Sequence, residues 1–465
     1  MFGRNCTSNR PRKVWQFVKN SVVSLGAVPV MTRVMYQLEQ VVAHALVPFA
    51  LLLMLLRARK EPDHMQSVSD RFGLGVVKHK GAVWVYAASL GETRAASPLV
   101  RRLRAAGYKV LLTHQSPAGR AEGKRLFGHD TGVAQAFIPL DLFWAIRIFL
   151  RRYKPVALIV MEIEIWPAML LETTRKGIPT IMANGNLLDR SIDKNRGLRS
   201  HLLQLYKLFS RIFTRADDYR DRYVSLGVDA ARVSVVGEMK FDQLTDPAHG
   251  QMARTLRANL AGAQRVLMIA SSVEAEEAML LPMVARLIAQ DAGLRVLWAP
   301  RSPQRFQAVA DAVSGLGLTV AQRSKLGAAM DGDIGTAQVL IGDSIGEMDA
   351  YYPVADLVFV GASLVDHGGH NIVEPLALGR PVVMGPSTYG IDFAAKPAAR
   401  LGTFQSLPDS AQLEQHIVDL FADPPSLARM SAAALEFTAE KSGAADATCR
   451  GIVAILAPPI EGAPL

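Results

Sequence analysis

The sequence predicts an α/β protein built from two doubly wound domains in succession, preceded by a basic segment that contains an apolar helix. Short runs rich in Val, Ile and Leu alternate with longer helical patterns, which is the rhythm of β-α-β units. The runs are apolar at consecutive positions, as in parallel strands that helices cover on both faces. The rhythm stops and restarts, and a chain of 465 residues is too long for one ordinary core. We therefore divide the chain into residues 1–62, 63–242 and 243–455.

Each domain is predicted from its own series of strands. In the first, apolar runs begin at Ala82 (AVWVYAAS), Lys109 (KVLLTHQS), Val156 (VALIVMEIE) and Ile178 (IPTIMANG), with a shorter pair near Ile212 and Val233. In the second, they begin at Arg265 (RVLMIASS), Leu294 (LRVLWAPR), Gln338 (QVLIGDS), Asp356 (DLVFVGAS) and Pro381 (PVVMGP). Phe241 to Ala263 carries no strand signal, so the boundary is placed near residue 242. Two Rossmann-like domains in this order predict a ligand-binding cleft between the carboxyl ends of their strands.

The N-terminal segment combines positive charge with the most apolar stretch of the chain. Residues 1–60 hold nine basic side chains and one acidic one, so they carry 9 − 1 = +8 of the formal net charge of +10. The apolar core, residues 41–56, is short for the roughly 20 residues that cross a bilayer. Basic residues flank it on both sides, and we interpret it as a retained membrane anchor that either spans the bilayer or lies in its interface. A buried core helix is the alternative.

The same charge distribution argues against nucleic acid as a partner, because the basic excess lies beside the apolar run and not on the predicted domains. Cys6 and Cys449 are the only cysteines, which provides no disulfide framework and no cysteine metal site. A body on the cytoplasmic side of a membrane fits this cysteine usage.

Two acidic motifs in the first domain follow predicted strands. In the segment SLGE, a strand ends in small residues and places Glu92 in the first turn of the next helix, where it is a candidate general base. A helix-start acid favoured by the helix dipole is the alternative. In MEIEIWP, Glu162 and Glu164 leave a wholly apolar strand two residues apart, which suggests a site. The alternative is that they pair with Arg175 or Lys176.

The polar motifs of the second domain suit a phosphate group. APRSPQR and GDSIGEM each follow a strand, and the first offers an arginine fork. In GASLVDHGGHNIVEP, a Gly-Gly turn opens a helix whose free backbone N–H groups can hold an anion. His367 and His370 lack the accompanying ligands of a metal site, so phosphate binding without a metal is the preferred interpretation.

In their order, these motifs resemble those of the Kdo (3-deoxy-D-manno-octulosonic acid) transferases across residues ~40 to ~440. The matching stretches are SLGET, MEIEIWP, GEMKFD, APRSPQRF, GDSIGEM, GGHNIVEP and PVVMGPSTYG. The resemblance implies the GT-B fold and a metal-independent, inverting glycosyltransferase. It also implies no cofactor, CMP-Kdo as the donor, and a lipid A precursor such as lipid IVA as the acceptor. The implied location is the cytoplasmic side of the inner membrane.

The resemblance also assigns residues. Glu92 matches the proton acceptor of the family, while Glu162 and Lys240 match positions that stabilise the transition state. The implied CMP-binding residues are Pro300, Arg301, Ile345, Gly346, Glu347, Asn371, Ile372, Val373 and Glu374, and no metal ligand is implied.

Three motifs depart from the family pattern. Ile163 replaces a polar residue, Glu238 replaces a neutral Asn or Ser, and SSVEAEE, with Ser272 and Val273, replaces STHEGEE. These departures leave a non-catalytic homologue as one alternative, against which the presence of Glu92 and Lys240 counts. A nucleotide-sugar epimerase on the same fold is the other alternative, although such an enzyme has no use for a membrane anchor.

Overall fold

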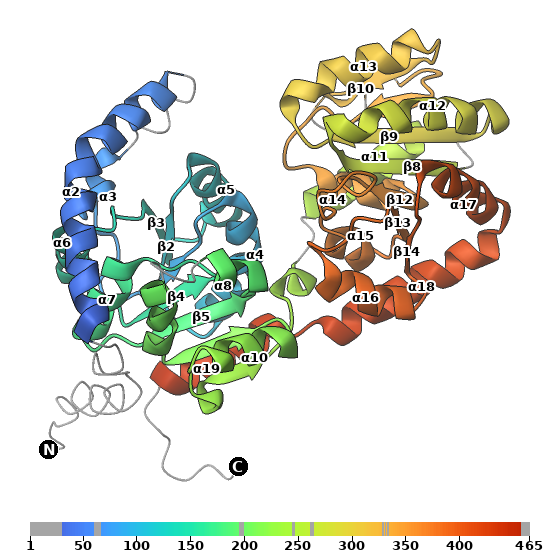
Figure 1. Ribbon diagram of the computed structural model, residues 1–465. Helices are drawn as coiled ribbons and strands as arrows, with labels where there is room; N and C mark the ends of the chain where they lie inside the picture. Colours follow the sequence, from blue (N-terminus) through green and yellow to red (C-terminus); the bar gives the residue numbers. More distant parts are fainter. Residues whose placement is uncertain are drawn as a thin grey trace, which may run out of the picture. The chain divides into compact units, whose positions relative to one another are not determined.

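The computed structural model describes residues 30–59, 67–194, 200–243, 247–260, 265–327, 330, 332 and 334–456. They form two compact units, one made of the described residues up to Gln243 and from Gly443 onward, the other of Leu244–Ser442. Each unit contains one seven-stranded parallel sheet (Figure 1). The predicted architecture of two doubly wound α/β units is confirmed.

The sheet of the first unit has the strand order β3-β2-β1-β4-β5-β6-β7, and all its described pairings are parallel. Its strands are β1 (Val83–Tyr86), β2 (Val110–His114), β3 (Val133–Phe137), β4 (Ala157–Met161), β5 (Thr180–Gly185), β6 (Arg211–Thr214) and β7 (Val233–Val235). Its helices are α2 (Val30–Ala58), α3 (Val68–Arg71), α4 (Leu90–Ala105), α5 (Pro117–Phe127), α6 (Phe143–Tyr153), α7 (Pro167–Arg175), α8 (Asp189–Lys194), α9 (Ser200–Leu203), η4 (Gln204–Leu208), α10 (Asp217–Ser225), η5 (Ala230–Arg232), η6 (Met239–Asp242) and α19 (Ala444–Leu456). The chain order reverses between β1 and β4, and ligands bind beside such a switch point at the carboxyl ends of the strands.

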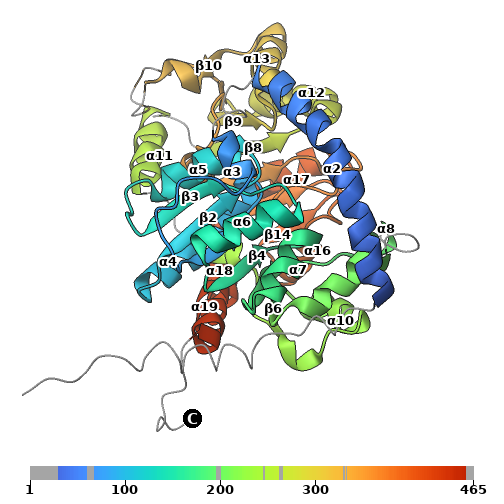
Figure 2. The ribbon, with the colours of Figure 1, turned by 90° about the vertical axis from the view of Figure 1, so that its left-hand side faces the viewer.

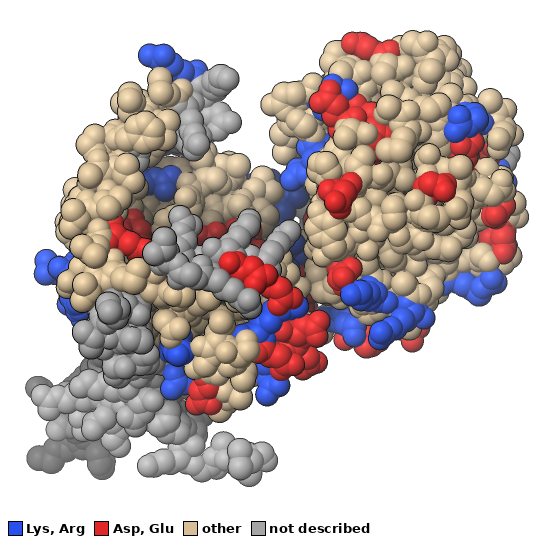
Figure 3. Space-filling view, in the orientation of Figure 1, with Lys and Arg blue, Asp and Glu red and all other residues tan. Residues whose placement is uncertain are grey.

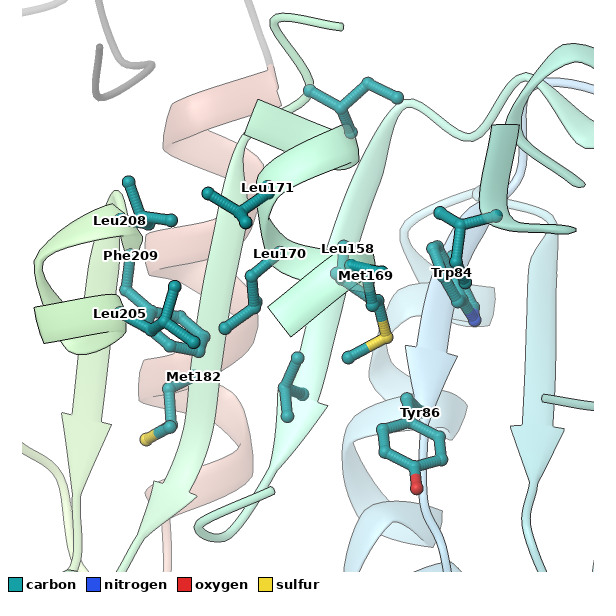
Figure 4. Packing of buried hydrophobic residues seen from close by; sticks show 14 of the residues in the cluster. Trp84, Tyr86, Leu158, Met169, Leu170, Leu171, Met182, Leu205, Leu208 and Phe209 are labelled. Atoms are coloured by element: carbon teal, nitrogen blue, oxygen red, sulfur yellow. The ribbon is translucent and has the colours of Figure 1, made fainter. Parts of the chain in front are cut away.

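The core of this unit lies on both faces of the sheet, because alternate residues of each strand point to opposite sides. On one face, Trp84 and Leu158 from neighbouring strands pack with Met169 of α7 (Figure 4). On the other face, Val85 and Ile159 belong to a separate cluster. Consecutive burial along β1 and β4 explains why these two segments are apolar throughout.

The sheet of the second unit has the order β10-β11-β9-β8-β12-β13-β14 and is also parallel throughout. Its strands are β8 (Arg265–Ser272), β9 (Leu294–Pro300), β10 (Val320–Gln322), β11 (Val339–Ile341), β12 (Leu357–Val360), β13 (Val382–Met384) and β14 (Phe404–Ser406). Its helices are α11 (Pro247–Asn259), α12 (Glu274–Gln290), η7 (Pro303–Arg305), α13 (Phe306–Gly315), η8 (Arg323–Lys325), α14 (Met348–Tyr351), η9 (Tyr352–Val354), α15 (Val373–Ala377), α16 (Asp392–Arg400), α17 (Ser410–Ala422) and α18 (Pro424–Lys441). Here the switch point lies between β8 and β12.

Three strands, β3, β10 and β14, were not predicted from the sequence. All three are edge strands, and two of them are only three residues long. An edge strand has one neighbour and carries more polar side chains than a central one, so it leaves no continuous apolar run. A continuous apolar run therefore indicates the central strands of each sheet and does not indicate these three edge strands.

The C-terminal helix α19 differs from the predicted division, which placed all of residues 243–455 in the second domain. The structure groups α19 with the first unit. Ile452 and Cys449 are buried in the cluster beside β1 and α4, and Arg102 of α4 pairs with Asp446. The carboxylate of Asp242 accepts hydrogen bonds from the N–H groups of Gly443 and Ala445, at the N-terminal end of α19. Burial of the apolar face of the helix thus decides its place.

Helix α2 is longer than the apolar core that the sequence indicated (Figure 2). One side of it lies against the first unit: the Tyr36 hydroxyl donates to the carbonyl of His201 at 2.8 Å, and the Gln40 amide donates to the carbonyl of Asp141 at 2.8 Å. The remaining surface is apolar and exposed, for example Val41 at 69% and Phe49 at 57%. The uncharged surface along this helix is visible in Figure 3.

Residues Val34–Leu56 form one helix long and apolar enough to cross a membrane, by length and composition alone, among the residues searched. Only 6% of the most apolar 18-residue stretch of this helix is buried, so this helix is not a core helix. The basic residues before position 30, and Lys60, lie outside the described residues.

Candidate active site

Glu92 lies at the carboxyl end of β1, in the first turn of α4. Ser89 is in extended conformation and caps the helix, its hydroxyl oxygen accepting from the N–H of Glu92 at 3.2 Å. The Glu92 carboxylate reaches back and accepts from the N–H of Ala88 at 2.9 Å and from the Ser89 hydroxyl at 3.0 Å. This reciprocal arrangement is close to a capping box, and it holds the carboxylate over the end of the strand.

The environment of Glu92 raises its pKa from 4.5 to about 7. Burial is the largest cause, because it disfavours the charged form. The negative charges of Glu162 and Glu164 raise the pKa further, while the hydrogen bonds from Ala88 and Ser89 lower it. A carboxylate with a pKa near neutrality is suited to accept a proton during a reaction at that pH.

Glu162 and Glu164 follow β4, which neighbours β1. The strand ends at Met161, and Glu162 has a φ of 60°, in the left-handed region that few residues other than glycine adopt. The turn after the strand holds both side chains close enough to Glu92 for their charges to act on it. The Glu164 carboxylate accepts from Trp166 Nε1 at 2.8 Å, and burial raises its pKa.

The partner of Glu162 is Arg215, which directly follows β6. Arg215 Nη2 lies 2.7 Å from Glu162 Oε1, and its side chain is only 5% exposed. The sequence alternative of pairing with Arg175 is wrong, since Arg175 instead lies 3.3 Å from Glu172. Burial by itself lowers the pKa of Arg215, but the carboxylates of Glu238 and Glu162 outweigh it and the pKa is raised.

Glu238 extends this network toward Lys240. Its carboxylate lies 2.9 Å from Arg215 Nε, and it also accepts from Asn184 Nδ2 at 2.8 Å and from the N–H of Lys240 at 3.1 Å. Asn184 in turn accepts from the N–H of Met239 at 3.1 Å. Lys240 lies in η6 with a partly exposed side chain. The two residues predicted to stabilise a transition state, Glu162 and Lys240, thus belong to one connected group.

The candidate donor residues lie at the carboxyl ends of three strands of the second sheet, β11, β9 and β12, and β8 lies between the last two. Arg301 follows β9, its N–H donates to the carbonyl of Ser272 at 2.9 Å, and its side chain is exposed. The segment after β11 contains Ile345, which is 70% exposed, and Gly346, whose φ is 92°. Glu347 is held at 2.6 Å by Arg323.

The segment after β12 makes the tight turn that the sequence predicted. Gly368 and Gly369 have φ values of 83° and 75°. Asn371 Oδ1 then accepts from the N–H of Val373 at 3.0 Å, and its amide donates to Glu374 at 3.1 Å. Of the other predicted donor residues, Pro300 is the last residue of β9. Ile372 is the N-cap of α15, and Val373 is the first residue of that helix.

His370 is half-buried and lies near enough to Arg301 to be affected by its charge. Burial is the main cause that lowers its pKa to about 4, and the positive charges of Arg301 and His367 add to the effect. It is neutral near pH 7. Across the described ranges no group of three or more His, Cys, Asp or Glu side chains is placed to hold a metal ion.

Comparisons with known proteins agree with the motifs. Residues 66–243 match the family model described as 3-deoxy-D-manno-octulosonic-acid transferase (kdotransferase). The 3-deoxy-D-manno-octulosonic acid transferase of Bordetella pertussis is 35% identical over 411 residues, which cover 86% of this chain and 94% of that protein. The enzyme of the same name from Haemophilus influenzae is 30% identical over 403 residues, 85% of this chain and 93% of that one. The chain belongs to the Kdo transferase family.

The solved structure of a UDP-GlcNAc 2-epimerase from Neisseria meningitidis shares the fold of this Kdo transferase family member at a TM-score of 0.57. It covers 81% of this chain and 99% of the epimerase at 14% identity, so it shows the fold alone. The chain is a glycosyltransferase with the GT-B arrangement of two parallel sheets, as the sequence predicted.

Sequence reasoning missed Arg215 and Asn184 as site residues. Arg215 is the first residue after β6, and Asn184 lies at the end of β5 with a φ of 60°. Both stand at carboxyl ends of strands, which is the signal used for Glu92 and Glu162. Applying it to the short strand near Ile212 would have found Arg215.

Proposed function

We propose that this Kdo transferase moves Kdo from CMP-Kdo to a hydroxyl group of a lipid A precursor, with Glu92 as the general base. The observation that carries the proposal is the Glu92 carboxylate, held at the end of β1 with a pKa of about 7 in a chain of this family. Family membership supports the donor, and lipid IVA is the acceptor that we propose.

The chemistry follows from what each group supplies. Glu92 takes the proton of the acceptor hydroxyl as its oxygen attacks the anomeric carbon of Kdo. The bond between that carbon and the phosphate oxygen of CMP breaks, and CMP leaves with the electron pair. Attack opposite to the leaving group inverts the anomeric configuration. The reaction thus yields the glycoside, CMP and a protonated Glu92.

Charge balance assigns roles to the other residues. Positive charge develops on the sugar as the bond to phosphate breaks, and the Glu162 carboxylate is suited to stabilise it. Negative charge develops on the phosphate, which positive groups such as Lys240 of the first unit or Arg301 of the second are suited to stabilise. The candidate CMP-binding segments are those at 300–301, 345–347 and 371–374.

The acceptor and the location are supported by α2. The apolar, exposed face of this helix suits the acyl region of a bilayer, where a lipid acceptor resides. We therefore propose that the protein is attached to the cytoplasmic side of the inner membrane through this helix.

The test is a transfer assay with the purified full-length protein, CMP-Kdo and a detergent-dispersed lipid A precursor. CMP release and the mass of the product are measured for the wild type, for Glu92→Ala, and for the control Glu440→Gln at an exposed position. We expect product from the wild type and the control, and a loss of about a hundredfold or more in Glu92→Ala, as for removal of a general base. Unchanged turnover in Glu92→Ala would reject Glu92 as the base, and no product from the wild type would reject the reaction.

A further inference from the structure

Arg215 is a buried cation that the proposed chemistry leaves without a task. Its guanidinium bridges two carboxylates from distant parts of the chain, 2.7 Å from Glu162 and 2.9 Å from Glu238. Its Nε also donates to the carbonyl of Asn184 at 3.2 Å. A planar guanidinium that is held at both Nε and Nη2 is fixed in position and in plane, and it orients the carboxylate that it binds.

Glu162 requires such support because of its backbone. Its φ of 60° is a conformation that costs free energy for a residue with a side chain, and it persists only where surrounding contacts hold it. The N–H of Glu162 donates to the carbonyl of Ala183 at 2.9 Å, which fixes the main chain. Among the described residues, it is Arg215 that forms an ion pair with the Glu162 side chain.

Glu238 keeps Arg215 from neutralising the site. One arginine shared by two carboxylates leaves one net negative charge, so Glu162 is held without losing its field at the reaction centre. Glu238 is 2% exposed in its side chain and is itself fixed by Asn184 and by the N–H of Lys240. Nε of the guanidinium is therefore held by Glu238 and Asn184, while Nη2 is held by Glu162.

We propose that Arg215 is a positioning residue for transfer: it sets the orientation of the Glu162 carboxylate, and Glu238 ties it to the segment that carries Lys240. This rests on the role of Glu162 under the proposed function. The buried ion pair Arg215–Glu238 thereby connects Glu162 with the main chain of Lys240 through one network of ion pairs and hydrogen bonds. Its purpose is catalytic geometry in addition to folding.

The test is a double-mutant cycle on kcat with Arg215→Met and Glu162→Gln. If Arg215 acts through Glu162, we expect Arg215→Met to lower kcat about 10- to 100-fold in the wild-type background, the range for a misplaced catalytic group. In the Glu162→Gln background the same change should cost less than about threefold, because the two residues act as a unit. Independent, multiplying losses would overturn the proposal.

Two further variants separate charge and geometry from stability. Arg215→Lys keeps the charge without the fork, and we expect it not to restore kcat; full restoration would contradict positioning by the fork. Arg222→Met is the matched control, because Arg222 forms an equally short ion pair at 2.8 Å with Asp189, whose side chain is 71% exposed. It should leave kcat unchanged. A loss as large as in Arg215→Met would overturn the specific role of Arg215, because an arginine that does not contact Glu162 would then have the same effect.

Folding and the proposed reaction are checked independently of the cycle. If Arg215→Met does not fold, Arg215→Met with Glu238→Gln removes both buried charges together and is used in its place. A crystal structure of the folded variant should show the Glu162 carboxylate displaced by about 1 Å or more. An unmoved carboxylate overturns the positioning proposal, whether or not the wild type transfers Kdo, whereas a silent wild type overturns only the proposed function.

Discussion

Replacing Glu92 by Gln is expected to stabilise the first unit while it abolishes most of the activity. In the folded chain the pKa of Glu92 is raised from 4.5 to about 7, mainly by burial. Well below pH 4.5 Glu92 is protonated in both the folded and the unfolded chain, so it does not change the free energy of unfolding. As the pH rises toward 7, the unfolded chain ionises Glu92 freely and the folded chain does not, so stability is lost. Above the folded pKa that loss is complete.

The size of the effect follows from the shift. Moving a pKa from 4.5 to about 7 corresponds to about 3 kcal/mol of unfolding free energy, and to less where water reaches the carboxylate. Gln has the shape of the protonated acid and cannot ionise. The variant and the wild type should therefore be equally stable near pH 4.5, and at pH 8 the variant should be more stable by about 1–3 kcal/mol. Its kcat should fall about a hundredfold.

The assay is hydrogen–deuterium exchange in the full-length protein at several pH values, following amides of β1 and α4, so that only the first unit is scored. Glu440→Gln, at an exposed position, is the control and should show no pH-dependent gain. A Glu92→Gln variant that is less stable than the wild type at pH 8, or a difference that does not grow between pH 4.5 and 8, would refute the reasoning.

Two further predictions concern the same unit. Because the charge of Glu164 raises the pKa of Glu92, Glu164→Gln should move the lower inflection of the kcat/KM profile from near pH 7 to a lower pH; an inflection that stays or rises would contradict the assigned electrostatics. In α2, where Leu46 and Leu52 are 53% and 51% exposed, Leu46→Glu with Leu52→Glu should reduce co-sedimentation with anionic vesicles and leave the thermal melt unchanged, whereas Tyr36→Ala, at a position 1% exposed, should lower the melting temperature. Equal vesicle binding by the Leu double variant would show that this face does not contact lipid.

Much of the candidate site was predictable because the rule behind it is local. A central parallel strand is buried on both faces, so it appears in the sequence as an unbroken apolar run, and the polar residue after it stands at the carboxyl edge of the sheet. That reasoning found Glu92 after β1 and Glu162 after β4. The ordered motifs then indicated the family, which the comparisons confirmed. The roles of these residues in catalysis stay predictions.

What the sequence by itself determined about this protein is therefore its fold class, its two sheets, its family and the strand ends that carry acidic groups. The tertiary structure alone decided which distant groups meet. Arg215 lies 53 positions from Glu162 and pairs with it because β4, β5 and β6 are neighbours in the sheet. Likewise, the apolar face of α19 is visible in the sequence, but its partner α4 is not. An amphipathic pattern states that a face is buried, and only the packing of the whole chain decides what covers it.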